Sequence, residues 1–422
     1  MNLAFFGLTA PLYNEISAPK VPPRNLSNSP SIMTAQERKA ALALASIYAL
    51  RMFGLFSILP VFAIYGRALQ GGEASYMVAL ALSIYGLTQA LFYIAYGAAS
   101  DRFGRKPVII IGLLVFALGS VVAALSTSVA GVVLGRALQG AGAVSSAITA
   151  LVADHTRDSV RSKAMAMVGG SIGVTFALAL VVAPPLAASI GVQGIFWITA
   201  VFALLAIAVL TTQVPDTPAA PEPAEAIHHG DVLFHPQLFR LNFGVFVLHC
   251  TLMAVFVVIP PLLVQYGQLP AAQHGWVYLP VLLVSFALMV PAMIAAEKKG
   301  KVRIVFLSGV SILLLTFAFA PLAAQAGRIA LIVFLLAFFF AFNLLEALQP
   351  SLVSRLAPAH MKGFALGVYN TTQAMGLFLG GILGGVVTKR LGDNSVFWLC
   401  AALCALWLGV AWGMQPPPKN SK

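Results

Sequence analysis

Long apolar segments, separated by short clusters of charge, glycine and proline, repeat along nearly the whole chain. Each is about twenty residues long, the length that a helix needs to cross a hydrocarbon core of roughly 30 Å. Uninterrupted apolar runs favour helices, which satisfy their own backbone hydrogen bonds, over barrel strands, which alternate in polarity. The pattern predicts an all-α membrane protein with twelve transmembrane helices. The predicted spans are 40–65, 75–99, 107–126, 130–153, 164–188, 193–213, 241–265, 274–296, 304–322, 328–354, 364–388 and 394–414.

The longest polar connector follows the sixth span and divides the chain into two halves of similar length. We expect a six-helix bundle over 38–213, a cytoplasmic linker over 214–239 and a second bundle over 240–414. The flanking segments 1–37 and 415–422 are polar enough to be tails, the first of them disordered. Met33 within that first tail is itself a plausible start of translation.

The two halves share a faint internal repeat. "ASDRFGRK" after the second span is echoed by "AAEKKGKV" after the eighth, with Glu297 and Gly300 in the places of Asp101 and Gly104. Repeated halves of this kind enclose a binding site near the middle of the membrane and alternate its access by rocking. The repeat predicts two pseudo-symmetric bundles with the architecture of a transporter.

The charges of the chain are few and unevenly placed. Only 9% of the 422 residues are charged, against roughly 25% in soluble proteins, and the net charge is +12. If both termini face the same side, that side holds 19 of the 25 lysines and arginines. Because cytoplasmic loops carry this excess, we expect a membrane protein with both termini in the cytoplasm. The bases form no patch with interleaved aromatics, so no nucleic-acid partner is expected.

The stretch "GAASDRFGRK" at 97–106 lies between the second and third spans. It resembles the loop signature G-x-x-x-D-R-x-G-R-K of the major facilitator superfamily, and "LGRALQGAGA" in the fourth span resembles that superfamily's R-x-x-Q-G signature. "YGLTQA", "GRALQG", "FNLLEAL" and "GVYNTTQ" are most similar to the YajR-type group of proton-driven exporters. This resemblance runs from Met33 to the last span. It implies a twelve-helix fold and transport by alternating access.

Two features depart from the pattern that the resemblance implies. Some members of the group add a soluble C-terminal domain, whereas this chain ends at Lys422, and we expect it to lack that domain. The antiporter signature of the fifth span has paired glycines after its proline. Here the segment reads "APPLAA", which keeps Pro184 without those glycines. Export is therefore the first expectation, and symport or facilitated transport stays open.

The resemblance also implies a latch at the end of the second helix. The carboxylate of Asp101 would accept hydrogen bonds from N–H groups at the start of the eleventh helix, near Gly363, and hold the halves together in the outward-facing state. The alternative is a solvated loop acid. Arg105 is expected to pair with Asp154. The proposed latch residues are Gly97, Asp101, Arg102, Gly104, Arg105 and Lys106.

Glu346 is the only acid deep within any predicted span, which makes it the first candidate for proton coupling. Burial favours the uncharged form of a carboxyl group, so Glu346 would take up and release a proton as its surroundings alternate. The alternative is a permanent structural pair with Arg51 or with a polar neighbour. Arg51 could equally bind an anionic substrate group. Arg136 and Asp154 complete the coupling set, although a structural hydrogen-bonding role for Arg136 is as plausible.

Candidate substrate contacts are polar or aromatic residues at helical spacing within the spans. A lone histidine is more often a packing residue, so His249 has both interpretations. The candidates are Tyr48, Tyr85, Gln89, Gln139, His249, Asn343, Asn370 and Gln373.

The sequence contains no Walker loop, nucleophile elbow or cluster of metal ligands, so we expect no enzyme activity, no cofactor and no metal site. These features together predict a proton-coupled secondary transporter, a monomer in the lipid bilayer, that exports a small organic molecule. One alternative is a proton symporter or facilitator for a sugar-like or anionic metabolite. A membrane receptor or scaffold without transport is the alternative from another class.

Overall fold

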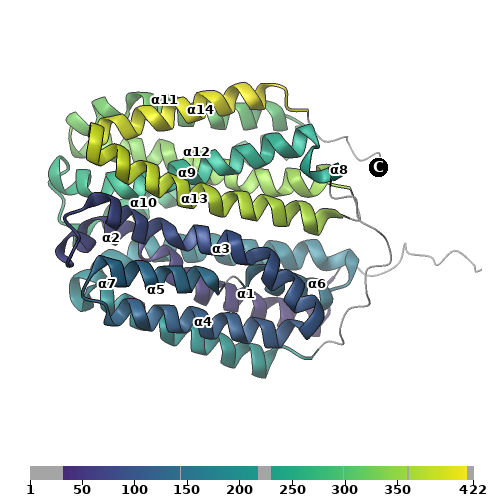
Figure 1. Cartoon of the computed structure of the whole chain (residues 1–422). Helices are drawn as coiled ribbons and strands as arrows, with labels where there is room; N and C mark the ends of the chain where they lie inside the picture. Colours follow the sequence, from purple (N-terminus) through teal and green to yellow (C-terminus); the bar gives the residue numbers. More distant parts are fainter. Residues whose placement is uncertain (1–31, 143, 217–229, 298, 359–360, 416–422) are drawn as a thin grey trace, which may run out of the picture.

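The computed structural model describes residues 32–142, 144–216, 230–297, 299–358 and 361–415. Apart from one isolated bridge between Gln70 and Ser128, the regular elements in these ranges are helices. Figure 1 shows them running side by side, with the first half of the chain below and the second half above. We call the end of the bundle with α6 and α8 the linker end, and the end with α2 the far end.

The helices of the first half are bounded as follows: α1 (Ala35–Phe56), α2 (Leu59–Tyr65), η2 (Gly66–Ala68), α3 (Ser75–Phe103), α4 (Arg105–Leu125), α5 (Val129–Ala141), α6 (Ser145–Asp154) and α7 (Asp158–Gln213). Those of the second half are α8 (Gly230–Leu233), α9 (Pro236–Gln265), η3 (Ala271–Gln273), α10 (Gly275–Glu297), α11 (Val302–Gln325), α12 (Arg328–Leu356), α13 (Lys362–Leu391) and α14 (Asp393–Trp412).

These helices account for the twelve predicted spans. Ten helical segments of the described residues are long and apolar enough to cross a membrane. One of them, within α7, has 51 residues, more than twice the length that a single crossing needs, and its backbone leaves the helical conformation at Gly191. It therefore supplies two spans. α5 and α6 together supply the remaining one, because Gly142, with ψ 48°, interrupts the fourth span between them.

The structure moves two of the boundaries predicted from the sequence. Residues 32–37 belong to an ordered helix start and not to a tail, because α1 begins at Ala35 with the Thr34 hydroxyl accepting from the Glu37 N–H. Residues 230–239 are likewise helical in large part, since α8 and the first turn of α9 lie there. Residues 1–31, 217–229 and 416–422 lie outside the described ranges.

The internal repeat appears in the turns. Gly104 after α3 and Gly300 after α10 both have positive φ, 91° and 65°. Gly191 within α7 and Gly392 before α14 have nearly the same conformation, with φ 71° and ψ 172° against φ 82° and ψ 169°. A side chain would strain the backbone at each of these positions. Corresponding turns of the two halves are thus built on glycines at corresponding places.

The two halves meet along α3 and α13, which run antiparallel. Lys389 lies 4.6 Å from the centre of the Tyr76 ring, and no room remains between Gly86 and the backbone of Ala374. Toward the linker end, Gly363 and Gly367 of α13 have no atom of the described residues within 4 Å of where a side chain would begin.

At the far end, further contacts join the halves. α2 packs against α9, and α7 packs against η3 and α10, where Gly275 abuts the backbone of Val181. At the linker end, α6 packs against α1, α3, α4 and α7, all from its own half. The halves are therefore held together most closely at the far end.

Candidate functional site

Three side chains from three helices of the second half meet around the amide of Gln373. The Gln373 Nε2 atom of α13 lies 2.6 Å from Nε2 of His249 on α9 and donates to Oε1 of Glu346 on α12 at 3.2 Å. The other ring nitrogen of His249, Nδ1, lies 3.1 Å from the Val245 carbonyl oxygen. Because a carbonyl only accepts, Nδ1 carries a hydrogen, and in the neutral ring Nε2 is free to accept from Gln373.

Glu346 is the accessible member of this cluster. Its side chain is 34% exposed while that of His249 is 5% exposed, and its Oε2 atom, 3.7 Å from His249 Nε2, has no hydrogen-bond partner in the described part of the chain. Its partners come from two other helices, so the carboxylate points among the helices and not toward lipid. The Oε2 atom is itself buried, so the carboxylate has one oxygen without a described partner inside the bundle, next to the His249 ring.

Arg51 does not pair with Glu346. Its guanidinium is fully buried in the first half, where Nη1 donates to the Ser145 hydroxyl at 2.8 Å and Nη2 to the Gly142 carbonyl at 3.3 Å. Tyr48 donates to the Ser145 carbonyl at 3.1 Å. Tyr48 and Arg51 therefore tie α1 to the break between α5 and α6, and the sequence-based alternative of an Arg51–Glu346 pair is not formed.

Arg136 is also fully buried, and its donors are occupied. Its Nη1 donates to Gln139 Oε1 at 2.8 Å, and its other nitrogens reach the backbone carbonyls of Ala81 and Leu82 on α3 at 3.4 and 3.5 Å. The Gln139 amide in turn donates to the Ser120 hydroxyl at 2.8 Å. Arg136 thus bonds to Gln139 of the same signature, and these hydrogen bonds join α5 to α3 and α4.

The ring of Tyr85 lies between these two arginines. The guanidinium carbon of Arg136 is 4.9 Å from the ring centre and that of Arg51 is 5.9 Å away. An aromatic face attracts a cation, most strongly where water is excluded. Tyr85 is 1% exposed, so in this conformation it stabilises two buried positive charges.

The remaining substrate candidates separate by exposure. Gln89 is buried and donates to the Tyr93 hydroxyl at 3.2 Å, and Asn343 is buried and donates to the Ser285 hydroxyl at 3.0 Å. Asn370 and Gln373 are only partly buried and lie one turn apart on α13. Of the eight candidates, these two lie on the partly exposed face near Glu346. Ser145 and Ser285 are partners that the sequence did not single out, because an isolated serine carries no signal of its own. Tyr93 follows Gln89 at helical spacing, and this spacing does indicate it as a partner.

At the linker end the expected pair between Arg105 and Asp154 is confirmed at 3.2 Å. Lys106 pairs with Asp216 at 2.8 Å, and this ammonium lowers the pKa of the Asp216 carboxyl below its usual value. Asp154, the last residue of α6, is therefore paired with the first residue of α4, whereas Glu346 lies in α12 of the second half.

The other proposed latch residues surround the same turn. Gly104 has positive φ, Gly97 lies within α3, and the exposed Arg102 lies over the Phe103 ring at 5.3 Å. The backbone of Asp101 is in the last turn of α3, whereas its side chain lies outside the described part of the structure. The antiparallel register of α3 and α13 places Asp101 level with the start of α13.

Comparison with known proteins identifies the family. Residues 44–381 match the model of the Major Facilitator Superfamily. The chain belongs to this superfamily. It is 44% identical over 390 residues to the inner membrane transport protein YajR of Escherichia coli (strain K12), covering 92% of this chain and 85% of that protein. Multidrug resistance protein 2 of Bacillus subtilis (strain 168) is 25% identical over 378 residues, covering 83% of this chain and 89% of its own.

Among solved structures, a D-xylose–proton symporter aligns with a TM-score of 0.73 at 16% identity, covering 89% of this chain and 98% of its own. This likeness shows the fold alone. The protein is thus a multi-pass, all-helical transporter of the YajR type, and not an enzyme. The resemblance inferred from the sequence motifs is confirmed.

Proposed function

We propose that the protein is a proton-coupled exporter of a small organic molecule, in which Glu346 takes up and releases the proton. The observation that carries the proposal is the shared amide: Gln373 bridges the accessible carboxylate of Glu346 and the buried imidazole of His249. An ionisable residue within a membrane span is a candidate functional site by default, and here it is joined to a second titratable group.

Protonation would rearrange the hydrogen bonds of this cluster. In the neutral ring, His249 accepts from the Gln373 amide. A proton on its Nε2 turns this atom into a donor, which the Gln373 N–H no longer fits. Either the amide turns to present its oxygen, or the ring donates to Glu346 Oε2 at 3.7 Å. The first change removes the bond from Gln373 to Glu346, and the second adds a direct bond between α9 and α12. Each therefore alters how α9, α12 and α13 are connected.

The packing gives a route from this change to the other half. α13 carries Gln373, and Ala374 next to it abuts Gly86 of α3 without space for a side chain. A shift of α13 therefore presses directly on the first half. The contacts between the halves at the far end, together with the room beside Gly363 and Gly367 of α13 among the described residues, support rocking about α3 and α13.

Membrane, orientation and direction follow from charge and similarity. The excess of Lys and Arg at the linker end supports a cytoplasmic location for that end and for both termini. The inner-membrane relative YajR supports the bacterial cytoplasmic membrane, and the similarity to a multidrug resistance protein supports export of a small organic molecule. The substrate would bind beside Asn370 and Gln373.

Proton symport or facilitated transport is the second candidate. The observation that favours it is "APPLAA" in the first part of α7, where the antiporter signature would have paired glycines. The same Glu346 cluster would serve in a symporter, with the direction of proton movement relative to substrate reversed.

A thermal-shift screen of small organic molecules on the purified protein, run at pH 5.5 and 8, tests coupling. We expect ligands that stabilise the parent to different extents at the two pH values. The Glu346→Gln variant should bind the same ligands without that difference, whereas Glu73→Gln, the same change at an exposed loop acid, should behave like the parent. An unchanged pH difference in Glu346→Gln would refute the role of this residue.

A further inference from the structure

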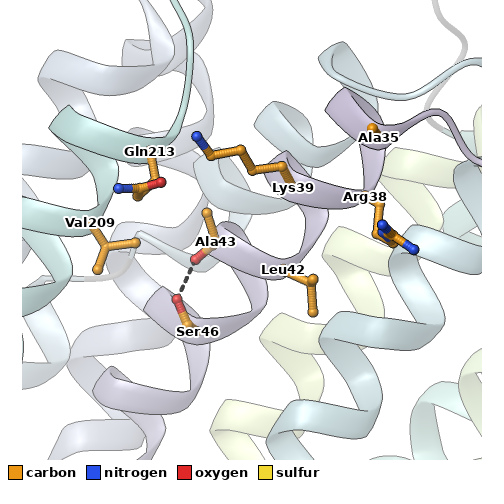
Figure 2. Close-up of a pocket in the computed structure, with 8 residues that line it drawn as sticks. All are labelled: Ala35, Arg38, Lys39, Leu42, Ala43, Ser46, Val209 and Gln213. Atoms are coloured by element: carbon orange, nitrogen blue, oxygen red, sulfur yellow. Dashed lines mark hydrogen bonds between the residues drawn. The ribbon is translucent and has the colours of Figure 1, made fainter.

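A groove of about 490 Å³ lies between the beginning of α1 and the end of α7, away from the Glu346 cluster. Its walls come from the first turns of α1 and the last two turns of α7 (Figure 2). The lining residues are Ala35, Arg38, Lys39, Leu42, Ala43, Ser46, Val209 and Gln213.

The groove carries positive charge that no acid of the described chain neutralises. Arg38 and Lys39 are both exposed and form no ion pair with a carboxylate of the described residues. Glu37, the acid next to them, is held by Arg157 through contacts of 2.7 and 3.0 Å on its two oxygens. The same hydrogen bonding raises the pKa of Arg157. Two cations therefore remain available for an external anion.

The groove also has an apolar part on the membrane side of these cations. Leu42 is 55% exposed, and Val209 faces α1 from α7. Figure 2 shows Lys39 extending toward Gln213, with Arg38 and Leu42 on the other flank of α1. The Ser46 hydroxyl donates to the Ala43 carbonyl at 2.7 Å and so is not free for a ligand. Polar donors thus lie at the outer rim, and aliphatic surface lies deeper.

The position of the groove along the helices fits that of a lipid headgroup. α1 begins and α7 ends here, so the groove spans the boundary between the apolar helices and the polar segments outside them. At this boundary anionic headgroups attract basic side chains, and acyl chains meet apolar ones.

We propose that this groove binds an anionic phospholipid. The phosphate would lie over the start of α1 between Lys39 and Gln213, with Arg38 on the other flank of the helix. One acyl chain would lie along Val209 and the other along Leu42. Two cations without an acidic partner among the described residues, next to apolar surface, fit a phospholipid better than a free phosphate. A free phosphate has no apolar part that could contact Leu42. A bound lipid would join α1 to the second part of α7 at the linker end, because the groove lies between these two helices.

The test is native mass spectrometry of the detergent-purified full chain with phosphatidylglycerol and, separately, phosphatidylcholine of matched acyl chains. We expect phosphatidylglycerol to bind more tightly. The Arg38→Gln/Lys39→Gln variant should lose about 25-fold in affinity for it, since each basic residue near an anionic surface contributes roughly fivefold. The control Lys299→Gln/Lys301→Gln, which removes two exposed cations from another loop of the linker end, should bind like the parent.

Two further measurements distinguish a lipid from other ligands of the groove. Leu42→Gln should weaken phosphatidylglycerol several-fold, whereas inorganic phosphate at millimolar concentration should not displace the lipid. Equal losses in both double variants would mean diffuse attraction to charge and would overturn the site. Equal binding of the two lipids would overturn it as well. Displacement by inorganic phosphate with no effect of Leu42→Gln would identify a site for a small anion instead.

Discussion

Phe176 of α7 and Phe342 of α12 bring the two halves together beside the Glu346 cluster. Their ring centres are 6.4 Å apart with an interplanar angle of 30°, and the Phe342 ring lies 5.6 Å from that of His249. Phe176 also contacts Phe256 and Phe339. A single residue of the first half thus inserts into an aromatic cluster of the second half, one turn before Glu346. Phe342 therefore contacts both Phe176 of the first half and His249 of the Glu346 cluster.

Replacing Phe176 by Ala should weaken this closure. The side chain is 6% exposed, and removing a buried aromatic ring costs about 3–5 kcal/mol in soluble cores. We expect spin labels placed on the two halves at the far end to show longer and broader distances by pulsed electron resonance. Phe319→Ala, the same change at a ring that is 61% exposed, should leave the distances as in the parent. Matching distances in both variants would argue against a closing role for Phe176.

The pH dependence of ligand binding should also require His249. The groups that face its ring are the Glu346 carboxylate, the Gln373 amide and the Val245 carbonyl. His249→Gln keeps a polar side chain that cannot take up a proton near neutral pH. We expect it to bind ligands found in the thermal-shift screen but to show a smaller affinity difference between pH 5.5 and 8 than the parent. A difference as large as that of the parent would contradict a role for His249 in the pH dependence.

Arg136→Leu tests whether the buried arginine is structural. The change leaves the Gln139 amide oxygen and two carbonyls of α3 without their donor. Each buried polar group without a partner costs about 1–3 kcal/mol, so the unfolding temperature should fall by several degrees. Arg355→Gln, at an exposed arginine, should leave it unchanged. A fully stable Arg136→Leu protein that no longer couples protons would instead assign Arg136 to proton transfer.

The crossing of α3 and α13 predicts an effect of a single methyl group. In Gly86→Ala the new carbon would lie 2.5 Å from the Ala374 carbonyl oxygen, so the helices must move apart. Overpacking of this kind costs about 1–3 kcal/mol. We expect a lower unfolding temperature and slower transport. Gly409→Ala, where no atom of the described residues lies within 4 Å, should be as stable as the parent or slightly more so, because alanine favours helix. Equal stability of the two variants would contradict the close crossing.

The sequence predicted the fold better than it predicted the partners. The spans follow from local composition, and the Arg105–Asp154 pair follows from a motif with fixed geometry. The partner of Glu346 could not be read in this way, because it depends on how α9, α12 and α13 are rotated about their axes. Arg51 was the obvious counter-charge by sequence, yet the structure places it with Ser145 in the other half. Gly191 and Gly392 form a second correspondence between the halves, because each precedes the last span of its half. This correspondence can be read from the sequence but was not among the predictions.

The central claim is that Glu346 carries the transported proton, and proton flux tests it most directly. Proteoliposomes containing a pH-sensitive dye would be loaded with a ligand from the screen and diluted to impose a ligand gradient. The parent and Glu73→Gln should change the internal pH as the ligand moves, whereas Glu346→Gln should bind ligand without moving protons. Proton flux in Glu346→Gln equal to that of the parent would contradict the account.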